Sequence, residues 1–238
     1  MRILAIGDIH GYRVALDAVL EAAAPTDEDW IVTVGDYVDR GPDSRGVLDR
    51  MLELQKTGRH IALRGNHEEM MMLSRDEPGL LPMWIMNGGQ DTLASYGSPG
   101  RMGTLADVPP AHWNFLDHVC IDWFEAEQFF FVHADALPHV GLSAQPTHVV
   151  RWQKLQPHPP HFSGKTMVCG HTVQHSGKPW NLDHLICIDT GIYLPTGKLT
   201  CLDVENGDYW QSDAAGNVTT GSLKKDREGE APAEPRNA

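Results

Sequence analysis

The sequence predicts a single α/β domain. Short apolar segments rich in Ile, Val and Phe recur along the chain, and Gly, Asp or Asn bounds them, as is typical of strands. Helical patterns separate the first of these segments, which indicates βαβ units with parallel strands. Antiparallel strands are expected later, where the helical patterns become rare. The chain has 238 residues, of which 41% are hydrophobic, and is therefore long enough to bury one sizeable core.

The expected elements follow in order along the chain. Seven segments carry the strand pattern: Ile3 to Ile6, Trp30 to Val34, His60 to Leu63, Phe129 to Val132, Thr166 to Cys169, Leu185 to Ile188 and Leu199 to Val204. Helices are predicted over Val14 to Ala24, over Ser44 to Lys56, and from near His67 through Leu73. Ser44 is the expected N-cap of the second helix and Gly58 its stop signal.

The rest of the chain divides into an insertion, a loop and a tail. We expect one domain over residues 1–221, with a helical insertion at about 78–119. The segment Gln156 to Ser163 mixes histidine with proline and is predicted to be a loop at the rim of the domain. Residues 222–238 lack apolar periodicity, which predicts a disordered tail.

Composition narrows the classes of function and location. The formal net charge of -13 argues against nucleic acid as a partner, because binding to its backbone depends on clustered Lys and Arg. No apolar run approaches the length of a membrane span, and no signal segment opens the chain, so we expect a cytoplasmic protein without a membrane partner. We also expect a monomer. Single, scattered cysteines favour reduced core residues: Cys120, Cys169, Cys187 and Cys201.

Potential metal ligands occur just past the strand-like segments. In open α/β sheets, side chains beyond the carboxyl ends of the strands converge into one crevice. Asp8 and His10 alternate with an apolar residue, which places them on one side of an extended segment. The expected ligands of two divalent ions are Asp8, His10, Asp36, Asn66, His133 and His171, with Asp36 as the bridge. Mixed oxygen and nitrogen donors suit Mn²⁺, Fe or Zn²⁺ better than Ca²⁺.

Other groups in the same motifs complete a site for phosphate chemistry. Two such ions would lower the pKa of a bridging water and so supply a hydroxide for direct in-line attack on phosphorus. His67 follows a predicted ligand directly and is the expected general acid, with Asp39 as its orienting partner. Arg40 offers a bidentate fork for phosphate oxygens, and Arg151 is a candidate for a second fork.

These motifs, taken together, resemble a known family. They are Gly7-Asp8-Ile9-His10-Gly11, Gly35-Asp36-Tyr37-Val38-Asp39-Arg40-Gly41, Arg64-Gly65-Asn66-His67-Glu68, Val132-His133-Ala134 and Gly170-His171-Thr172. Their order and wording resemble the phosphoprotein phosphatases among the calcineurin-like metallophosphoesterases, most of all the compact bacterial and bacteriophage serine/threonine phosphatases. The resemblance covers roughly residues 1–205.

The resemblance has implications for fold, cofactor and reaction. It implies a four-layer sandwich of two mixed β-sheets flanked by helices, and a dinuclear site usually active with Mn²⁺. It also implies hydrolysis of phosphomonoesters without a covalent intermediate. One metal would take Asp8, His10 and Asp36. The other would take Asp36, Asn66, His133 and His171.

One residue departs from the family pattern, and another has an expected structural role rather than a catalytic one. Where the family usually has Gly after His-Ala, this chain has Asp135, which would support a ligand or repel an anionic substrate. Glu68 opens a predicted helix, where an acidic side chain favours the helix dipole, so a structural role is expected. The sequence around Arg151 is not distinctive.

Four functions compete for this pattern. We expect a protein serine/threonine phosphatase acting on phosphorylated proteins or peptides, with activity on phosphotyrosine left open. The alternative is a symmetrical dinucleoside polyphosphate hydrolase acting on diadenosine tetraphosphate. Those enzymes tend to carry Asp after the Asn-His pair, whereas this chain has Glu68. A catalytically weak binding module would not need His67 as an acid, and a nuclease suits neither the acidity nor the motifs.

Overall fold

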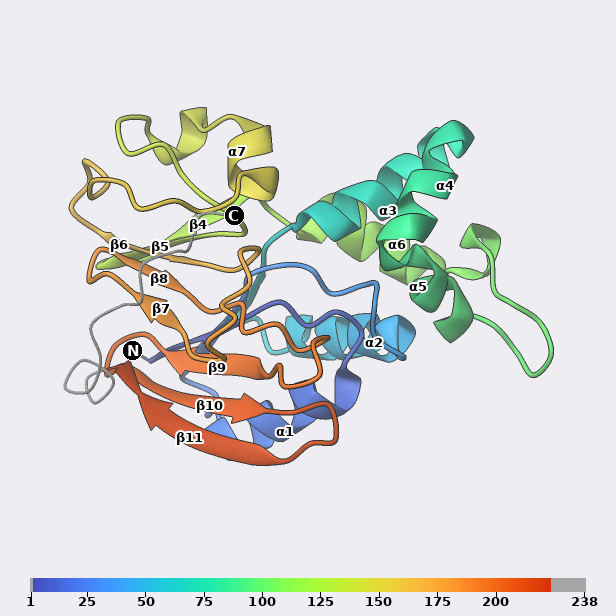
Figure 1. Cartoon of the computed structure of the whole chain (residues 1–238), viewed down its shortest axis with the longest axis horizontal. Coiled ribbons are helices and arrows are strands. Elements are labelled where there is room, and N and C mark those ends of the chain that lie inside the picture. The colour runs from blue at the N-terminus through green and yellow to red at the C-terminus, as the bar shows by residue number, and fades with distance from the viewer. Residues whose placement is uncertain (1, 224–238) are drawn as a thin grey trace.

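Two mixed β-sheets make up one half of the molecule, and most of the helices lie beside them (Figure 1). The structure is a computed structural model and describes residues 2–223. The first sheet has six strands in the order β11-β10-β9-β1-β2-β3. Their bounds are β1 Ile3–Ile6, β2 Trp30–Thr33, β3 His60–Ala62, β9 Leu199–Asp203, β10 Asp208–Ser212 and β11 Val218–Ser222. The strands β1, β2 and β3 are parallel, and β9, β10 and β11 pair antiparallel, as the sequence predicts for the two ends of the chain.

The second sheet differs from the prediction in the direction of its strands. It has five strands in the order β4-β5-β6-β8-β7. Their bounds are β4 Trp123–Glu125, β5 Phe129–Val132, β6 Thr166–Cys169, β7 Trp180–Asn181 and β8 Leu185–Cys187. The expectation of antiparallel strands is wrong for β5, β6 and β8, which are parallel. The connection from β5 to β6 contains mostly loop around η5 Leu142–Ala144 and the short α7 Thr147–Trp152, so it lacks the helical pattern that usually marks a crossover.

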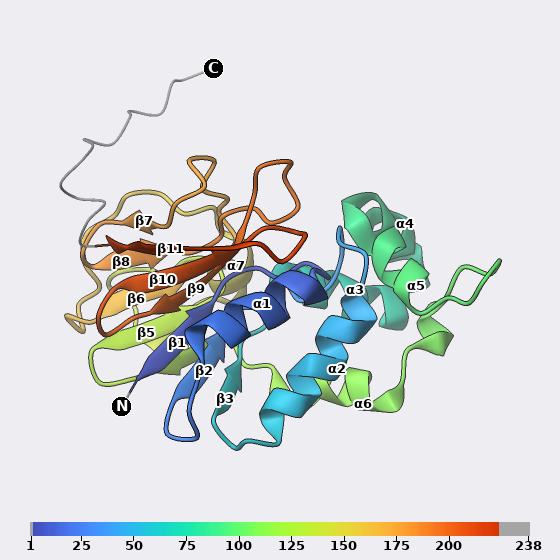
Figure 2. The same cartoon turned by 90° about the horizontal axis from the view of Figure 1, so that it is seen from below.

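Three helices follow the three parallel strands of the first sheet. They are α1 Arg13–Ala23, α2 Ser44–Gln55 and α3 Asn66–Asp76. The helices α1 and α2 lie beside the first sheet, on the side away from the second (Figure 2). The predicted N-cap of α2 is wrong by one residue, because the Asp43 carboxylate accepts the backbone N–H of Gly46. The Ser44 hydroxyl instead accepts the backbone N–H of Asp39.

Short helices fill the segment between α3 and β4. They are η1 Pro78–Leu80, α4 Leu81–Trp84, η2 Ile85–Gly89, α5 Gln90–Ser95, η3 Leu105–Asp107, α6 Pro110–Asn114 and η4 Phe115–Val119. We call residues 78–119 the helical insertion. At the other end of the chain, Ser222 pairs with Asp208 within the first sheet, although the sequence assigned it to the tail. Residues 224–238 of the predicted disordered tail lie outside the described residues.

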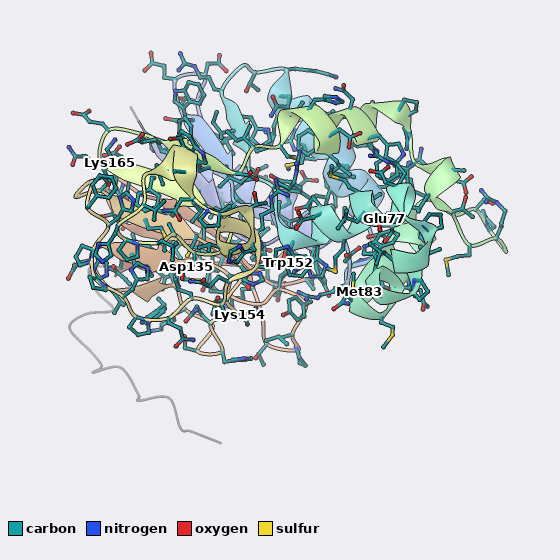
Figure 3. All side chains as sticks on the ribbon, turned by 90° about the horizontal axis from the view of Figure 1, so that it is seen from above. Glu77, Met83, Asp135, Trp152, Lys154 and Lys165 are labelled. Atoms are coloured by element: carbon teal, nitrogen blue, oxygen red, sulfur yellow. The ribbon has the colours of Figure 1, made fainter. Side chains whose placement is uncertain are left out.

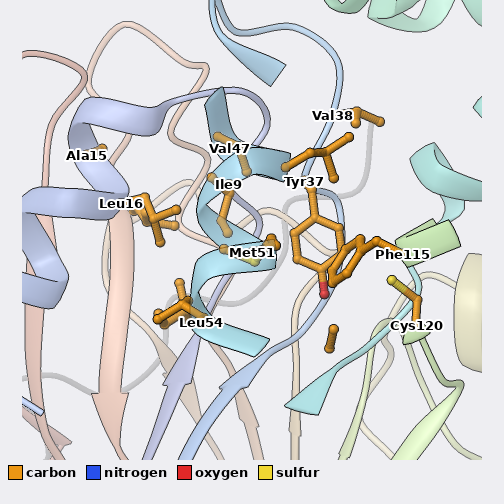
Figure 4. Close-up of a cluster of buried hydrophobic side chains, with 14 of the residues drawn as sticks. Ile9, Ala15, Leu16, Tyr37, Val38, Val47, Met51, Leu54, Phe115 and Cys120 are labelled. Atoms are coloured by element: carbon orange, nitrogen blue, oxygen red, sulfur yellow. The ribbon is translucent and has the colours of Figure 1, made fainter. Parts of the chain in front are cut away.

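The core has layers on both faces of the first sheet. One layer joins that sheet to the helices and the insertion, and there Tyr37 packs between Met51 and Phe115 (Figure 4). Another lies between the two sheets and includes Ala5 and Phe131. Because the sheets pack face to face, the carboxyl ends of their parallel strands meet at one edge of the molecule. All four cysteines are buried with free thiols, as predicted, and no helix within residues 2–223 is long and apolar enough to cross a membrane.

Candidate dinuclear metal site

The loops at the shared edge of the two sheets carry the predicted ligands. Asp8 and His10 follow β1, Asp36 follows β2, Asn66 follows β3, His133 follows β5 and His171 follows β6. Within residues 2–223, seven residues other than glycine have a positive φ, and five of them are here: His10, Asp36, Asp39, Arg40 and His171. A left-handed backbone at a residue with a side chain is unfavourable, and such strain gathers at functional sites.

Asp36 lies at the centre of the cluster. Its Oδ2 is 3.5 Å from His10 Nε2, and its Oδ1 is 3.4 Å from His133 Nε2. Two groups have ligand atoms within 4.8 Å of one another, namely His10 with Asp36 and His67, and Asp36 with His133 and His171. The two oxygens of one carboxylate therefore face two different histidines, which is the arrangement a bridging ligand needs.

Backbone carbonyls orient the two central histidines. His10 Nδ1 donates to Val38 O at 2.9 Å, and His133 Nδ1 donates to Val34 O at 2.8 Å. Each ring therefore directs an unprotonated Nε2 toward Asp36, as metal-binding histidines do. Burial lowers the pKa of His10 and of His133 below 6.5 and outweighs the opposing charge of Asp36, so both rings stay neutral. This donor set fits divalent ions that accept nitrogen and oxygen ligands.

The other predicted ligands surround this centre. Asn66 Oδ1 lies 3.1 Å from His133 Nε2. His171 donates Nε2–H to Trp152 O at 3.0 Å, which leaves Nδ1 as its free ring nitrogen. Asp8 is buried, but it belongs to neither three-residue group, and its carboxylate accepts the backbone N–H of His171 at 3.0 Å.

Asp189 is a further acidic residue of the site and is not among the residues predicted from the sequence. It is buried just past β8, and its Oδ1 accepts the Gly191 N–H. Burial and the charge of Asp36 raise the pKa of Asp189 to about 6. Burial, followed by the charges of Asp189 and Asp36, also raises the pKa of Asp8. The signal was present in the sequence, because Asp189 follows an apolar segment as the predicted ligands do.

The predicted acid and its partner lie next to this cluster. His67 Nδ1 is 2.7 Å from Asp39 Oδ2, and His67 Nε2 is 4.0 Å from Asp36 Oδ2. Burial alone would lower the pKa of His67, but Asp36 and Asp39 outweigh it and raise the pKa above 6.5. The geometry therefore favours an imidazolium that presents Nε2–H toward Asp36.

Arg40 points into the same cluster. Its Nη1 donates to His10 Nε2 at 2.6 Å, and the centre of its guanidinium lies 4.2 Å from the centre of the Tyr193 ring. This contact is short enough for a cation–π interaction. Arg40 is thus a cation beside the predicted metal ligands, as a phosphate-binding residue needs to be.

The Arg151 side chain is paired with two acidic residues. Its guanidinium forms ion pairs with Glu69 at 2.7 Å and Asp122 at 2.6 Å. Lys154 lies nearer to the predicted ligands, because its Nζ donates to His171 O at 2.8 Å. Figure 3 shows Trp152 and Lys154 between the sheets and the helices that carry Met83. Lys154 is therefore a further cation beside a predicted ligand, at a position that its sequence context did not mark.

Two further carboxylates support the surrounding loops. Glu68 is buried and accepts the backbone N–H groups of Asp36, Tyr37 and Gly65 at 2.7 to 2.9 Å, which agrees with a structural role. Asp135 accepts from Gln153 at 2.8 Å and lies 3.1 Å from His158 Nε2. It therefore ties the predicted rim loop to the end of β5.

Two side chains of the helical insertion contact Asp39, and neither was selected from the sequence. Trp84 Nε1 lies 3.0 Å from Asp39 Oδ1 and 2.9 Å from Oδ2, and Thr92 Oγ1 donates to Oδ1 at 2.7 Å. Burial raises the pKa of Asp39, and hydrogen bonds from His67, Thr92 and Trp84 oppose that rise. Motif spacing does not predict contacts between residues 45 and 53 positions apart in the chain.

Comparison with known sequences agrees with this geometry. The calcineurin-like phosphoesterase family matches residues 1–175. Serine/threonine-protein phosphatase 1 of Salmonella typhimurium is 40% identical over 85 residues, which are 35% of this chain and 37% of that protein. The symmetrical bis(5'-nucleosyl)-tetraphosphatase of Ralstonia nicotianae is 36% identical over 141 residues, which are 56% of this chain and 42% of that protein. The chain thus spans well under half the length of these two relatives.

Solved structures share the fold. A protein-tyrosine phosphatase of Shewanella has a TM-score of 0.60 at 17% identity, over 92% of this chain and 80% of its own. A serine/threonine phosphatase of Saccharomyces cerevisiae has a TM-score of 0.58 at 15% identity, over 99% of this chain and 81% of its own. These likenesses establish the predicted arrangement of two mixed sheets with flanking helices. With the family match over most of its length, the chain belongs to the calcineurin-like phosphoesterases.

Proposed function

We propose that this protein is a metal-dependent phosphomonoester hydrolase that removes phosphate from phosphoserine and phosphothreonine in proteins or peptides. One observation carries the proposal. The His67–Asp39 pair, at 2.7 Å, lies against the Asp36 cluster, and Arg40 is directed into that same cluster. A site that only stored metal would need neither a proton donor nor a cation beside the ligands.

The cofactor would be two divalent ions, for which Mn²⁺ is our first candidate and Fe or Zn²⁺ the alternatives. The residues that would hold them are Asp8, His10, Asp36, Asn66, His133 and His171. When bound, such a pair polarises phosphate oxygens and lowers the pKa of coordinated water. The oriented histidines and the divided carboxylate of Asp36 support this assignment.

The chain's own residues then have distinct roles. Arg40 binds non-bridging phosphate oxygens through its guanidinium fork, and Lys154 adds a second positive charge at the mouth of the site. His67 donates the proton of Nε2 to the leaving oxygen. Asp39 accepts Nδ1–H and stabilises the imidazolium before transfer. Arg151 remains a prediction from sequence, with its guanidinium paired to Glu69 and Asp122.

The bacterial relatives support protein phosphatase as the main activity, and one of them favours a second candidate. The similarity to serine/threonine-protein phosphatase 1 of Salmonella is short, at 35% of this chain, but reaches 40% identity. The similarity to the Ralstonia tetraphosphatase is longer and supports hydrolysis of diadenosine tetraphosphate as the alternative. A cytoplasmic monomer is part of the proposal, and sedimentation of the purified protein tests its oligomeric state.

A metal-reconstituted substrate screen tests the proposal. The purified protein, loaded with Mn²⁺, is given phosphoserine, phosphothreonine and phosphotyrosine peptides and diadenosine tetraphosphate, and Asp36→Asn serves as the inactive control. We expect release of phosphate from the phosphoserine and phosphothreonine peptides. Efficient cleavage of the dinucleotide with intact peptides would establish the alternative. Inactivity on every substrate with Mn²⁺, Fe and Zn²⁺ would refute the assignment as an enzyme.

A further inference from the structure

Asp39 is more tightly held than its role as a histidine partner requires. Its side chain is fully buried and accepts hydrogen bonds from three different groups. His67 Nδ1 donates to Oδ2, Thr92 Oγ1 donates to Oδ1, and Trp84 Nε1 lies within 3.0 Å of both oxygens. Two of these three donors come from the helical insertion rather than from the sheet loops that carry the other site residues.

Thr92 also holds the backbone of Asp39. Its hydroxyl accepts the Asp39 N–H at 2.8 Å while it donates to the carboxylate of the same residue. The neighbouring Arg40 donates its backbone N–H to Gly88 O at 3.2 Å. Asp39 and Arg40 both have a positive φ, of 75° and 69°. Residues of the insertion therefore hold the backbone of Asp39 and Arg40, the two strained residues beside the predicted acid His67.

We propose that Trp84 and Thr92 are positioning residues for proton donation by His67. The inference rests on the proposed phosphomonoesterase activity. The terminal torsion of an aspartate is broad, so a carboxylate without fixed donors can rotate. The Trp84 N–H bridges both oxygens of Asp39, and the Thr92 hydroxyl fixes Oδ1. Together they hold Oδ2 toward His67 Nδ1 and so fix the orientation of the imidazole.

The proposed role has a chemical signature. As the P–O bond to the leaving group breaks, the leaving oxygen takes the proton of His67 Nε2 and departs as an alcohol. A water molecule gives its oxygen and one proton to the phosphate, and its other proton passes to solvent. The imidazole is left neutral with Nδ1–H still on Asp39. Proton donation matters greatly for a basic leaving oxygen and little for one that is stable as an anion. Loss of positioning should therefore depend on the leaving group.

Two pairs of variants separate this role from simple damage to the fold. Thr92→Val removes the hydroxyl with little change in volume, and Thr92→Ser restores it. Trp84→Phe removes the indole N–H. Trp113→Phe makes the same change at an insertion residue whose ring packs on Arg75, away from Asp39. Each protein is assayed with phenyl phosphate, which has a basic leaving oxygen, and with 2,4-dinitrophenyl phosphate, which has a weakly basic one.

The measured quantity is the ratio of kcat for the two substrates. Within one protein sample this ratio is independent of the folded fraction. We expect Thr92→Val and Trp84→Phe to lower kcat for phenyl phosphate by about 10- to 100-fold, as expected for loss of a hydrogen bond to a charged group. For the dinitrophenyl ester we expect a decrease of less than about 3-fold. Thr92→Ser and Trp113→Phe should keep the wild-type ratio.

The possible outcomes distinguish failure of the positioning role from failure of the proposed phosphomonoesterase activity. An unchanged ratio in both Thr92→Val and Trp84→Phe, with normal wild-type turnover, would overturn the positioning role alone. A ratio that Thr92→Ser fails to restore would count against it as well. Absence of wild-type turnover with both esters would instead refute the proposed phosphomonoesterase activity.

Discussion

His60 is a buried histidine that the fold keeps neutral, and this predicts a specific dependence of stability on pH. The residue begins β3, and 6% of its surface is exposed. Gln55 Nε2, which can only donate, lies 3.1 Å from His60 Nδ1 and 3.4 Å from His60 O. Nδ1 must therefore accept, and Nε2 carries the proton that is donated to Thr33 Oγ1 at 3.0 Å. No acidic side chain accepts a hydrogen bond from this ring within the described residues.

The size of the effect follows from the pKa. Burial lowers the pKa of His60 from 6.5 to about 3. The unfolded chain therefore binds this proton first as the pH falls, so the stabilising contribution is complete above pH 6.5 and is lost progressively toward pH 3. Each pH unit between these values changes the free energy of unfolding by about 1.4 kcal/mol. Between pH 7.5 and pH 5.0 the loss amounts to about 2 kcal/mol.

Urea unfolding of wild type and His60→Gln at these two pH values measures the effect. The other titrating groups are common to both proteins, so the difference between the two pH-dependent losses isolates His60. We expect wild type to lose about 2 kcal/mol more than the variant. His118→Gln, at an exposed position in the insertion, is the matched control and should lose as much as wild type. Equal losses in wild type and His60→Gln would refute the argument.

Three further predictions concern the candidate site. His67→Asn should lower kcat by about 10²- to 10⁴-fold while metal content, measured by atomic absorption after dialysis, stays the same; undiminished turnover would exclude His67 as the acid. Glu68→Ala should lower the free energy of unfolding by at least about 2 kcal/mol, because it leaves the buried N–H groups of Asp36 and Tyr37 without their acceptor. A denaturation midpoint equal to that of wild type would contradict this role. Tyr193→Leu should weaken competitive inhibition by inorganic phosphate by about 2- to 5-fold, because Arg40 loses its cation–π contact with the ring. Tyr193→Phe keeps the ring and should keep the inhibition. Equal inhibition constants in the two variants would disprove a role for this contact.

The convergence of the candidate ligands at one edge of the molecule was largely predictable from sequence. Asp36, Asn66, His133 and His171 each lie just past a strand-like segment, and parallel strands bring such positions to one edge whatever the lengths of the connections. The division of the candidate ligands between the two metal positions was less predictable. The structure groups His67 with His10 and Asp36, and it holds Asp8 through the backbone of His171 instead. Such detail depends on loop geometry, which strand pattern does not contain.

Side-chain contacts across long separations in the chain were not predictable. Trp84 and Thr92 reach Asp39 across 45 and 53 residues, and no periodicity relates such positions. The ion pairs of Arg151 with Glu69 and Asp122 were equally unpredictable, and its role as a phosphate ligand stays a prediction.

Two strands of the first sheet were also missed, for a different reason. The hairpin of β10 and β11 contains Asp, Gln, Ser and Thr among few apolar residues, so it lacks the apolar run that marks the central strands. Its edge position accounts for this composition, since β11 ends the sheet and several of its side chains face water. Pairing with β10, rather than the pattern of β11 itself, defines the strand.

The division of the ligands between two sheets has a consequence for residues far from the chemistry. His10 and Asp36 follow strands of the first sheet, and His133 and His171 follow strands of the second, so the width of the apolar layer between the sheets affects the span of the cluster. Side chains in that layer, such as Val32 and Phe131, act as spacers. The 3.4 Å between Asp36 Oδ1 and His133 Nε2 therefore depends on how the core between the sheets is packed. A change of side-chain volume in that core would alter the distance between the candidate ligands.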